Sequence, residues 1–510
     1  MKDKIKSLVI VACSLFALTS CLDTEPVSSL TDQNMWKNEG HYSAFVRGVH
    51  SQLRKDLPNL FTLGELRCGH YSDEQSFSIE SVTSLYCLNM LDEDNPGLEN
   101  YAGLYTNINQ INLFISKALD TDILSAKERS YYLGEMYGLR AFYYFHLLRS
   151  WGNVIWNEDP STGFEIGNLA RPVNSASEVM TNIKKDIQSS IDNFGNDYNF
   201  REKKSYWSKA ATLMLKAEVF LWSSRQMEGG QADAQEALKA LNDIKTNLPD
   251  LGLIEDGYAN VFDYDNKANK EMIFVIHHGE NEYELFNSKW RDGFMPANEV
   301  IKNQYDMETG TNFDASIINF GGRIFYPLKP QVYNDFDAMD TRRDVTVKAV
   351  YSTETDHAYK GCFPYKYQGL NPKGTTTRYM GDDFPIYRYA DLLLLTAEAK
   401  SLTNGDPTSE INDIRKRAYA DNYDEATIGY PNYPGDNDGI DEVLLRERYK
   451  EFLFEGKRWY DLRRFGNEYV FKYTTADPQH PKRLLWPIDK ITLTNNSALH
   501  QTDGYKTVYQ

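Results

Sequence analysis

The chain of 510 residues is long enough for one large domain or for two to three domains of ordinary size. Apolar residues make up 41% of it, enough to fill a core, and charged residues make up 25%, as on ordinary globular surfaces. The net charge of −18 at pH 7 argues against nucleic-acid binding, because that function relies on Lys and Arg to contact phosphates. The 35 Tyr residues favour a binding surface, since each joins a flat apolar face to a polar tip.

Residues 1–20 have the pattern of a secretory signal peptide. Three lysines precede the apolar run 8–18, which is too short to span a membrane as a stable helix. Residues 18–21, Leu-Thr-Ser-Cys, indicate a bacterial lipobox, in which the signal is removed and Cys21 carries lipid. An ordinary signal with a coincidental cysteine is the alternative. The polar residues 21–35 would then be a lipid anchor and tether that holds the folded part away from the membrane.

A first helix is expected from Trp36 to about Leu57. Pro58 would end it, because proline lacks the backbone N–H that a helix interior needs. Residues 60–100 then mix polar and aromatic residues without a period, which predicts a long structured loop. Long ordered loops often carry function, so this loop is a candidate ligand region, and a surface loop without a role is the alternative.

Three cysteines remain once the signal is removed and Cys21 is lipidated: Cys68, Cys87 and Cys362. An odd number excludes complete internal pairing, and their spacing matches no zinc site. A disulfide between Cys68 and Cys87 and three free thiols are both compatible with the sequence.

Residues 36–250 are expected to form an N-terminal helical part. Apolar residues at steps of three and four over 101–119 and 128–151 predict an antiparallel helix pair. The ranges 208–227 and 232–248 predict a second pair with small residues at the contact. Such pairs are typical of tetratricopeptide-like packing, although no strict period of about 34 residues is present.

The character of the sequence changes at residue 251. Residues 251–385 are rich in Gly, Asn, Asp, Pro and aromatics, with short strand-like runs at 272–278 and 344–351. This composition predicts a loop-rich, ligand-binding subdomain inserted between helical repeats. Helical periodicity resumes at Ile386, so residues 386–510 are expected to hold the C-terminal helical repeats and a tail.

The C-terminal part contains a charged stretch that is expected to be a helix from Asp441 onward, with Asp441 as its cap. Glu447, Glu451 and Glu455 recur every four residues and would share one face. Arginines of the same stretch are near enough to pair with them, so an ion-pair lock between helices is expected, because an unpaired buried carboxylate would be too costly. General acid–base catalysis is the alternative, but no Ser/His or metal-ligand partner lies nearby in the sequence.

Four segments resemble the SusD/RagB-like family of outer-membrane nutrient-binding lipoproteins of Bacteroidetes. Residues 447–464 read ERYKEFLFEGKRWYDLRR, 138–154 read GLRAFYYFHLLRSWGNV, and 386–402 read IYRYADLLLLTAEAKSL. The tail, 484–505, is a looser match, because it lacks the Asn and Pro of the family's closing motif. The resemblance implies a mainly α fold of degenerate tetratricopeptide-like helix pairs with a loop-rich inserted subdomain containing short strands.

The resemblance also implies a function. It suggests a cell-surface protein, anchored in the outer membrane by lipid on Cys21, that captures oligosaccharides and acts as the lid of a SusC-like TonB-dependent transporter. No bond is broken in this function, so no enzyme is expected. A peptide-binding, RagB-like member of the family is the alternative. An all-helical glycoside hydrolase that uses two carboxylates of residues 447–461 and a protein–protein scaffold are further alternatives.

A site for neutral sugars needs aromatic faces for the sugar rings and amides, carboxylates or arginines for the hydroxyls. Exposed arginines would favour an anionic sugar or a peptide carboxylate. The candidate ligand-binding residues lie in the two irregular regions and are Tyr71, Asp73, Tyr86, Asn89, Trp290, Tyr326, Arg378 and Tyr379.

Sequence motifs for the common catalytic and cofactor sites are absent, including the nucleophile elbow, the zinc-protease helix, the redox dithiol, the P-loop and the dinucleotide fingerprint. Residues 436–442 alternate carboxylates as calcium loops do, but without the full spacing of about 12 residues. No cofactor is expected, although the resemblance permits a structural calcium. His277 and His278 could bind a metal only with further ligands.

Overall fold

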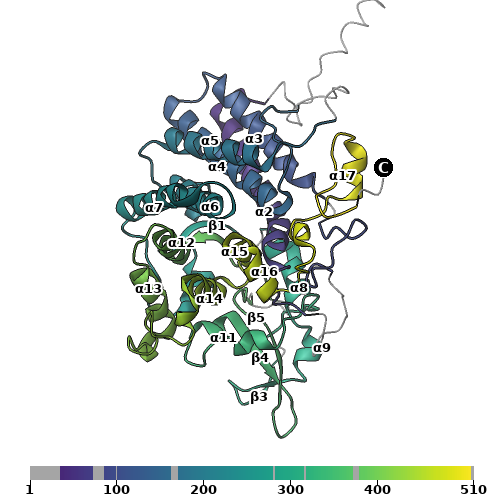
Figure 1. Ribbon diagram of the computed structural model, residues 1–510, viewed down its shortest axis with the longest axis vertical. Coiled ribbons are helices and arrows are strands. Elements are labelled where there is room, and N and C mark those ends of the chain that lie inside the picture. The colour runs from purple at the N-terminus through teal and green to yellow at the C-terminus, as the bar shows by residue number, and fades with distance from the viewer. Residues whose placement is uncertain are drawn as a thin grey trace, which may run out of the picture.

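Helices dominate the computed structural model, which describes residues 35–72, 85–98, 100–161, 170–279, 282–314, 318–371 and 378–506. The mainly α class predicted from the sequence is therefore confirmed, with a few short strands in two small sheets. Figure 1 shows the helices stacked along the long axis of the molecule and most of the strands toward one end. Within the described ranges, no helix is both long and apolar enough to cross a membrane.

The N-terminal helices pack on one another in sequence order, as their periodicity predicted. They are α2 (Glu39–Glu65), α3 (Gly103–Leu119), α4 (Ala126–Trp151), α5 (Ala176–Phe194), α6 (Lys209–Gln226) and α7 (Gly230–Asn247). Ser125, Ser175 and Ser208 each accept a hydrogen bond from a first-turn N–H and so fix the starts of α4, α5 and α6. Gly138 lets Trp207 approach α4, because a Cβ at Gly138 would lie 2.1 Å from the indole nitrogen.

The expected end of the first helix at Pro58 is wrong, because α2 continues through this residue for two further turns. The two turns bury Leu60, Phe61 and Leu63 in the core. Burial of such side chains contributes about 1.5–3 kcal/mol each, whereas proline in a helix interior costs about 3 kcal/mol. Tertiary packing therefore outweighs the local preference.

The inserted part begins after α7 and holds two small sheets. Its elements are η3 (Tyr258–Val261), η4 (Tyr264–Asn266), β1 (Met272–Ile276), η5 (Leu285–Ser288), α8 (Lys289–Phe294), α9 (Asn298–Ile301), β2 (Tyr305–Asp306), β3 (Thr311–Asn312), α10 (Gln331–Asn334), α11 (Arg342–Thr346), β4 (Val347–Tyr351), β5 (Tyr359–Pro364) and β6 (Phe384–Arg388). The strand β1 pairs antiparallel with β6, and the second sheet has the order β3-β2-β4-β5. The strand predicted at 272–278 is thus confirmed, whereas the one predicted at 344–351 starts later because α11 occupies its first residues.

The C-terminal part returns to helices, as predicted. They are α12 (Tyr389–Leu402), α13 (Thr408–Tyr419), α14 (Ile440–Phe452), α15 (Arg458–Phe465), α16 (Asn467–Tyr473) and α17 (Lys490–Asn495), with short turns η6 (Ala420–Asn422), η7 (Asp436–Asp438) and η8 (Pro481–Leu484).

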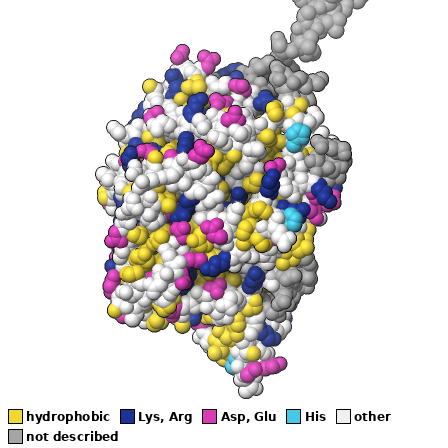
Figure 2. Space-filling view, in the orientation of Figure 1, with side chains coloured by type: hydrophobic (Ala, Val, Ile, Leu, Met, Phe, Trp, Pro, Cys, Tyr) yellow, Lys and Arg dark blue, Asp and Glu magenta, His cyan; other side chains and the backbone are white. Residues whose placement is uncertain are grey.

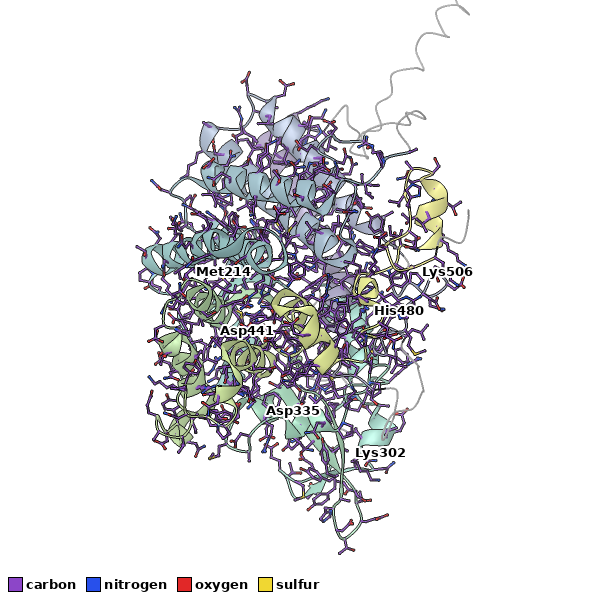
Figure 3. The ribbon with its side chains drawn as sticks, viewed as in Figure 1. Met214, Lys302, Asp335, Asp441, His480 and Lys506 are labelled. Carbon is purple, nitrogen blue, oxygen red and sulfur yellow. The ribbon has the colours of Figure 1, made fainter. Side chains whose placement is uncertain are left out.

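The charged stretch is two helices rather than one. The helix is interrupted between α14 and α15, where Phe454 and Gly456 have positive φ values of 69° and 70°. Gly456 meets Gly64 of α2 so closely that a Cβ on Gly64 would lie 1.8 Å from the Gly456 carbonyl oxygen. Asp441 does not cap α14 but lies in its first turn, beside α12 in Figure 3, and pairs with Arg225 of α6 at 2.8 Å.

The predicted lock of buried ion pairs is present, but the expected partners are wrong: Arg342, Arg388, Arg415 and Arg417, all outside the stretch, pair with the three glutamates. Its members come from the inserted part, α13 and the α14–α15 region, and are termed the charged core cluster: Glu271, Arg342, Arg388, Arg415, Arg417, Glu447, Glu451 and Glu455. The Glu451 carboxylate alone meets Arg388 at 2.6 Å, Arg417 at 2.5 Å and Arg342 at 3.2 Å. All of these side chains are buried, so the cluster joins the inserted part to the C-terminal helices through the interior.

The electrostatics of the cluster keep its carboxylates ionised. Burial alone would raise the pKa of Glu447 and Glu455, but Arg415 beside Glu447 and Arg388 beside Glu455 outweigh it and lower both pKa values to about 2. Arg417, Arg388 and Arg342 outweigh burial at Glu451 in the same way and hold its pKa well below the usual range. These groups therefore act as fixed charges at neutral pH.

A continuous set of buried apolar side chains, from Trp36 to Tyr505, runs through the N-terminal, inserted and C-terminal parts. Figure 3 shows the space between the ribbons filled by side chains. On the face shown in Figure 2, Lys and Arg alternate with Asp and Glu without an extended basic patch, in line with the argument against nucleic-acid binding.

Candidate ligand-binding site

A cavity of about 380 Å³ opens where the end of α2 meets the loop before α3 and the segment η5–α8. We term it the aromatic cavity. Its lining residues are Pro58, Asn59, Phe61, Thr62, Leu66, Tyr86, Gly97, Leu98, Asn100, Phe286, Lys289, Phe294 and Tyr326. The two turns of α2 beyond Pro58 supply one wall, so the unexpected continuation of that helix is what builds the cavity. Its volume lies in the range of small-molecule sites.

Five aromatic residues contribute to the apolar side of the cavity, and Tyr86, Phe294 and Tyr326 form one group among them. Tyr326 lies 5.4 Å from Phe294 and 6.1 Å from Tyr86 between ring centroids. The Tyr326 backbone N–H donates to the Gly293 carbonyl at 2.9 Å, which ties this ring to α8. Burial, followed by the nearby Tyr86, raises the pKa of Tyr326, so its hydroxyl stays neutral and can both donate and accept hydrogen bonds.

Gly97 is required for the position of Tyr86. It has φ of +78°, and a Cβ there would lie 2.7 Å from the Tyr86 ring and 2.8 Å from the ring of Trp486. Trp486 also packs against Tyr86, at 6.3 Å between centroids. Gly97 therefore leaves room for both rings, and the contact with Trp486 helps to fix the position of Tyr86.

The polar side of the cavity carries side chains without hydrogen-bond partners among the described residues. The side chains of Asn59, Thr62 and Asn100 make no hydrogen bond to another described residue, and Lys289 has no ion-pair partner within the described ranges. Such groups can bind the hydroxyl, amide or carboxylate groups of a ligand. No Asp or Glu is found among the described lining residues.

Two of the predicted aromatic residues lie behind the cavity. Tyr71 is buried, with its ring 5.9 Å from Phe294 and 6.5 Å from Tyr326. Trp290 is fully buried and its ring is 4.6 Å from Phe294. Both side chains support the lining rings in this structure and have no open face of their own.

Asn89 is engaged within the protein. Its side-chain oxygen accepts a hydrogen bond from Arg67 Nε at 2.9 Å, and its amide donates to the Arg67 carbonyl at 3.2 Å. It therefore fixes the loop that carries Tyr86. The predicted residues Asp73 and Cys21 lie outside the described residues.

Arg378 and Tyr379 are not part of the aromatic cavity. Arg378 lines a second cavity, where its Nη1 donates to the Gln368 carbonyl at 3.0 Å and its guanidinium lies over Phe320. The Tyr379 hydroxyl donates to the Gly279 carbonyl. The eight predicted residues are thus divided: Tyr86 and Tyr326 line one cavity, and Arg378 lines another.

Sequence reasoning missed the polar lining residues. Asn59 and Thr62 lie in the part of α2 that was expected to be a loop, so their place on a helix face could not be read. Lys289 and Asn100 carry no local signal that separates them from other surface residues. Phe294 lies within an apolar run of the inserted part, where its aromatic character was the only indication.

The structure offers no acid–base or metal chemistry at the other candidates. Glu447, Glu451 and Glu455 are buried, paired with arginines and absent from the aromatic cavity, so the hydrolase hypothesis built on them is wrong. The Asp436 carboxylate pairs with Arg415 at 2.8 Å, so it is engaged within the protein. No group of three or more His, Cys, Asp and Glu side chains within the described ranges is placed to hold a metal ion.

The histidine pair and the cysteines are also accounted for. His277 Nδ1 lies 2.8 Å from Asp383, and burial, followed by Arg54, lowers the pKa of His278 to about 3. Cys68, Cys87 and Cys362 are buried, and the possible Cys68–Cys87 disulfide is not formed.

Comparisons with known proteins point to one family. The sequence model of the SusD family matches residues 297–505. A SusD superfamily protein from Bacteroides vulgatus is 42% identical, with a TM-score of 0.86, over 92% of this chain and 100% of that one. B. fragilis NanU is also 42% identical, with a TM-score of 0.88, over 95% and 100%. The starch-binding protein SusD of Bacteroides thetaiotaomicron is 30% identical over 139 residues, which are 25% of this chain and 22% of that protein.

Proposed function

Because the chain belongs to the SusD family, we propose that it is a lipid-anchored, cell-surface binding protein that holds an oligosaccharide in the aromatic cavity. It would deliver this ligand to a SusC-like TonB-dependent transporter in the outer membrane and act as the lid of that transporter. The observation that carries the proposal is the meeting of Tyr86, Phe294 and Tyr326 with unengaged amide and hydroxyl side chains in one cavity. The similarity to the starch-binding protein SusD supports a glycan as the ligand class.

The two sides of the cavity match the two kinds of surface on a sugar. The ring faces accept the apolar C–H face of a pyranose, and Asn59, Thr62 and Asn100 bind its hydroxyls. The rings are held from behind by Trp290 and Tyr71, so little side-chain entropy is lost when the ligand binds. The proposed mechanism is binding and release, without a chemical step.

Calorimetry on the chain beginning at residue 22 tests this proposal. We expect an oligosaccharide from a neutral and acidic glycan panel to bind, and the double variant Tyr86→Ala/Tyr326→Ala to bind it at least ~10-fold more weakly, since each stacking contact contributes about 0.5–1.5 kcal/mol beyond area burial. Tyr305→Ala in β2, away from the cavity lining, is the matched control and should leave the affinity unchanged.

A product assay on the same samples separates binding from turnover. Release of shorter sugars by the wild-type chain would contradict the proposal. Binding from a peptide library in place of every glycan would instead support the RagB-like alternative.

A further inference from the structure

A second cavity, of about 630 Å³, lies in the inserted part of the chain. We term it the distal cavity. It is lined by the η3–η4 segment, by α11 and by the chain on either side of residues 372–377. Its described lining residues are Ala259, Phe262, Asp263, Tyr264, Asp265, Val345, Lys366, Gln368, Gly369, Leu370, Asn371, Arg378 and Asp382.

The distal cavity is separate from the aromatic cavity. The two share no described lining residue. Between them stands a wall of buried rings, in which Phe262 contacts Tyr367 at 5.9 Å, Tyr367 contacts Trp290 at 5.1 Å, and Trp290 contacts Phe294 at 4.6 Å. Phe262 faces one cavity and Phe294 the other, so a ligand in one cannot reach the other through the wall.

The aromatic part of the distal cavity is fixed in place. Phe262 forms part of the lining, and Tyr264 packs against Gly381, where a Cβ would lie 2.9 Å from the Tyr264 ring. The Lys267 ammonium lies 4.2 Å from the centroid of the same ring. A ring held by a glycine and a lysine keeps one orientation before any ligand arrives, as a stacking surface requires.

The polar part of the lining has groups without partners. The side-chain amides of Gln368 and Asn371 and the carboxylate of Asp265 make no hydrogen bond or ion pair with another described residue. Amide and carboxylate groups beside an aromatic ring are the combination that binds sugar hydroxyls. The backbone N–H of Asp265, by contrast, is used by Asp263, which caps η4 at 2.8 Å.

The charges of the distal cavity disfavour an anionic ligand. Both cations in the lining are engaged, Lys366 with Glu455 at 2.8 Å and Arg378 with the Gln368 carbonyl at 3.0 Å. The unpaired Asp265 carboxylate would repel a ligand carboxylate. This cavity therefore differs from the aromatic cavity, where Lys289 is the one charged residue in the described part of the lining.

From this geometry we infer that the distal cavity is a second saccharide-binding site, which takes a neutral sugar unit. The choice of a saccharide rests on the proposed function, whereas the existence of a second site rests on the cavity itself. Two sites on one chain would let a polymer with repeating units bind more tightly than a single unit does, because the second contact is made at high effective concentration.

Calorimetry with maltoheptaose, laminarihexaose and xylohexaose tests the inference on five forms of the chain: the wild type, Tyr86→Ala/Tyr326→Ala, Gln368→Ala/Asn371→Ala, the fourfold variant that combines these two pairs, and Tyr86→Ala/Tyr326→Ala with Tyr264→Ala added. The side chains of Gln368 and Asn371 make no hydrogen bond or ion pair with another described residue, so Gln368→Ala/Asn371→Ala should fold like the wild type. We expect at least one of these neutral sugars to retain measurable binding in the tyrosine variant. This residual binding should fall at least ~10-fold when Gln368→Ala/Asn371→Ala is added, and Tyr264→Ala should have the same effect.

Two outcomes would overturn the inference. If residual binding survives all four substitutions, the second sugar-binding site lies outside the distal cavity. If the tyrosine variant loses all neutral-sugar binding, the chain has no second site for these sugars. Both outcomes leave the aromatic cavity as the glycan site. Failure of every glycan to bind the wild type would instead contradict the proposed function as well, so the two failures are distinguishable.

Discussion

Replacing Glu451 by Gln is the most direct test of the charged core cluster. The side chain is fully buried and meets three guanidinium groups, those of Arg388, Arg417 and Arg342. Glutamine has nearly the same shape, so the substitution removes the charge and leaves the packing. The three arginines then share the remaining carboxylates, and Arg417 depends on Glu271 alone, at 3.1 Å.

The expected loss of stability is large. Removing one partner of a buried ion pair costs about 3–5 kcal/mol, because the other charge is left uncompensated in a medium of low polarity. A folded body of this size has an unfolding entropy of about 1 kcal/mol/K, at roughly 2 cal/mol/K per residue. The Tm should therefore fall by about 3–5 °C.

Differential scanning calorimetry at pH 7 measures this shift, and calorimetric titration at 25 °C measures glycan affinity for the same variant. Glu442→Gln is the matched control, since it makes the same chemical change on α14 at an ion pair whose Lys472 side chain is 56% exposed, where about 0–1 kcal/mol is expected. A Glu451→Gln variant with an unchanged Tm would refute the reasoning. So would a loss of binding at an unchanged Tm, because it would give Glu451 a direct functional role.

Three further predictions follow from the same structure. Glu447 and Glu455 have folded pKa values of about 2, below their ordinary 4.5, so their stabilising contribution is present above pH 4.5 and lost as the pH falls toward 2; the Tm should drop between pH 5 and pH 3, and a flat profile would contradict the assignment. Gly97→Ala should lower both glycan affinity and stability, the latter by about 1–2 kcal/mol, because φ is positive and the added Cβ displaces Tyr86; titration and a melting curve measure both, and two unchanged values would show that the loop can relax. Lys289→Met should weaken binding of carboxylate-bearing sugars by ~3- to 10-fold at low salt and leave neutral sugars unaffected; equal weakening of both classes would indicate a packing role.

Much of the helical frame could be predicted from local sequence, for physical reasons that are local. The steps of three and four over 101–119 and 128–151 correspond to α3 and α4, because one apolar face must meet a neighbour. Ser175 begins α5 because its hydroxyl accepts a hydrogen bond from the first turn. The spacing of the glutamates indicated buried ion pairs, since arginines and aromatics left no clean polar face for them.

The errors have a common cause, which is that distant contacts decided the local structure. α2 passes Pro58 because core packing outweighs the missing hydrogen bond. The expected single helix from Asp441 divides at Gly456 because α2 approaches it at Gly64, a contact that no local pattern encodes. Trp290 is of a residue type that often contacts ligands, but whether its ring faces a cavity or the core depends on the three-dimensional packing around it.

The charged core cluster also sets the order in which the chain can complete its folding. Glu271, Arg342 and Arg388 are synthesised before Glu451, and until α14 has joined them two arginines lack their shared buried counter-charge. Arg388 keeps Glu271 and Arg342 keeps Asp340, each at 2.7 Å, but both lack the carboxylate that they share, so the inserted part is less stable as an independent folding unit. A chain cut short before α14 should therefore lose the aromatic cavity as well, although its lining residues within the described ranges all precede α14 by more than a hundred positions.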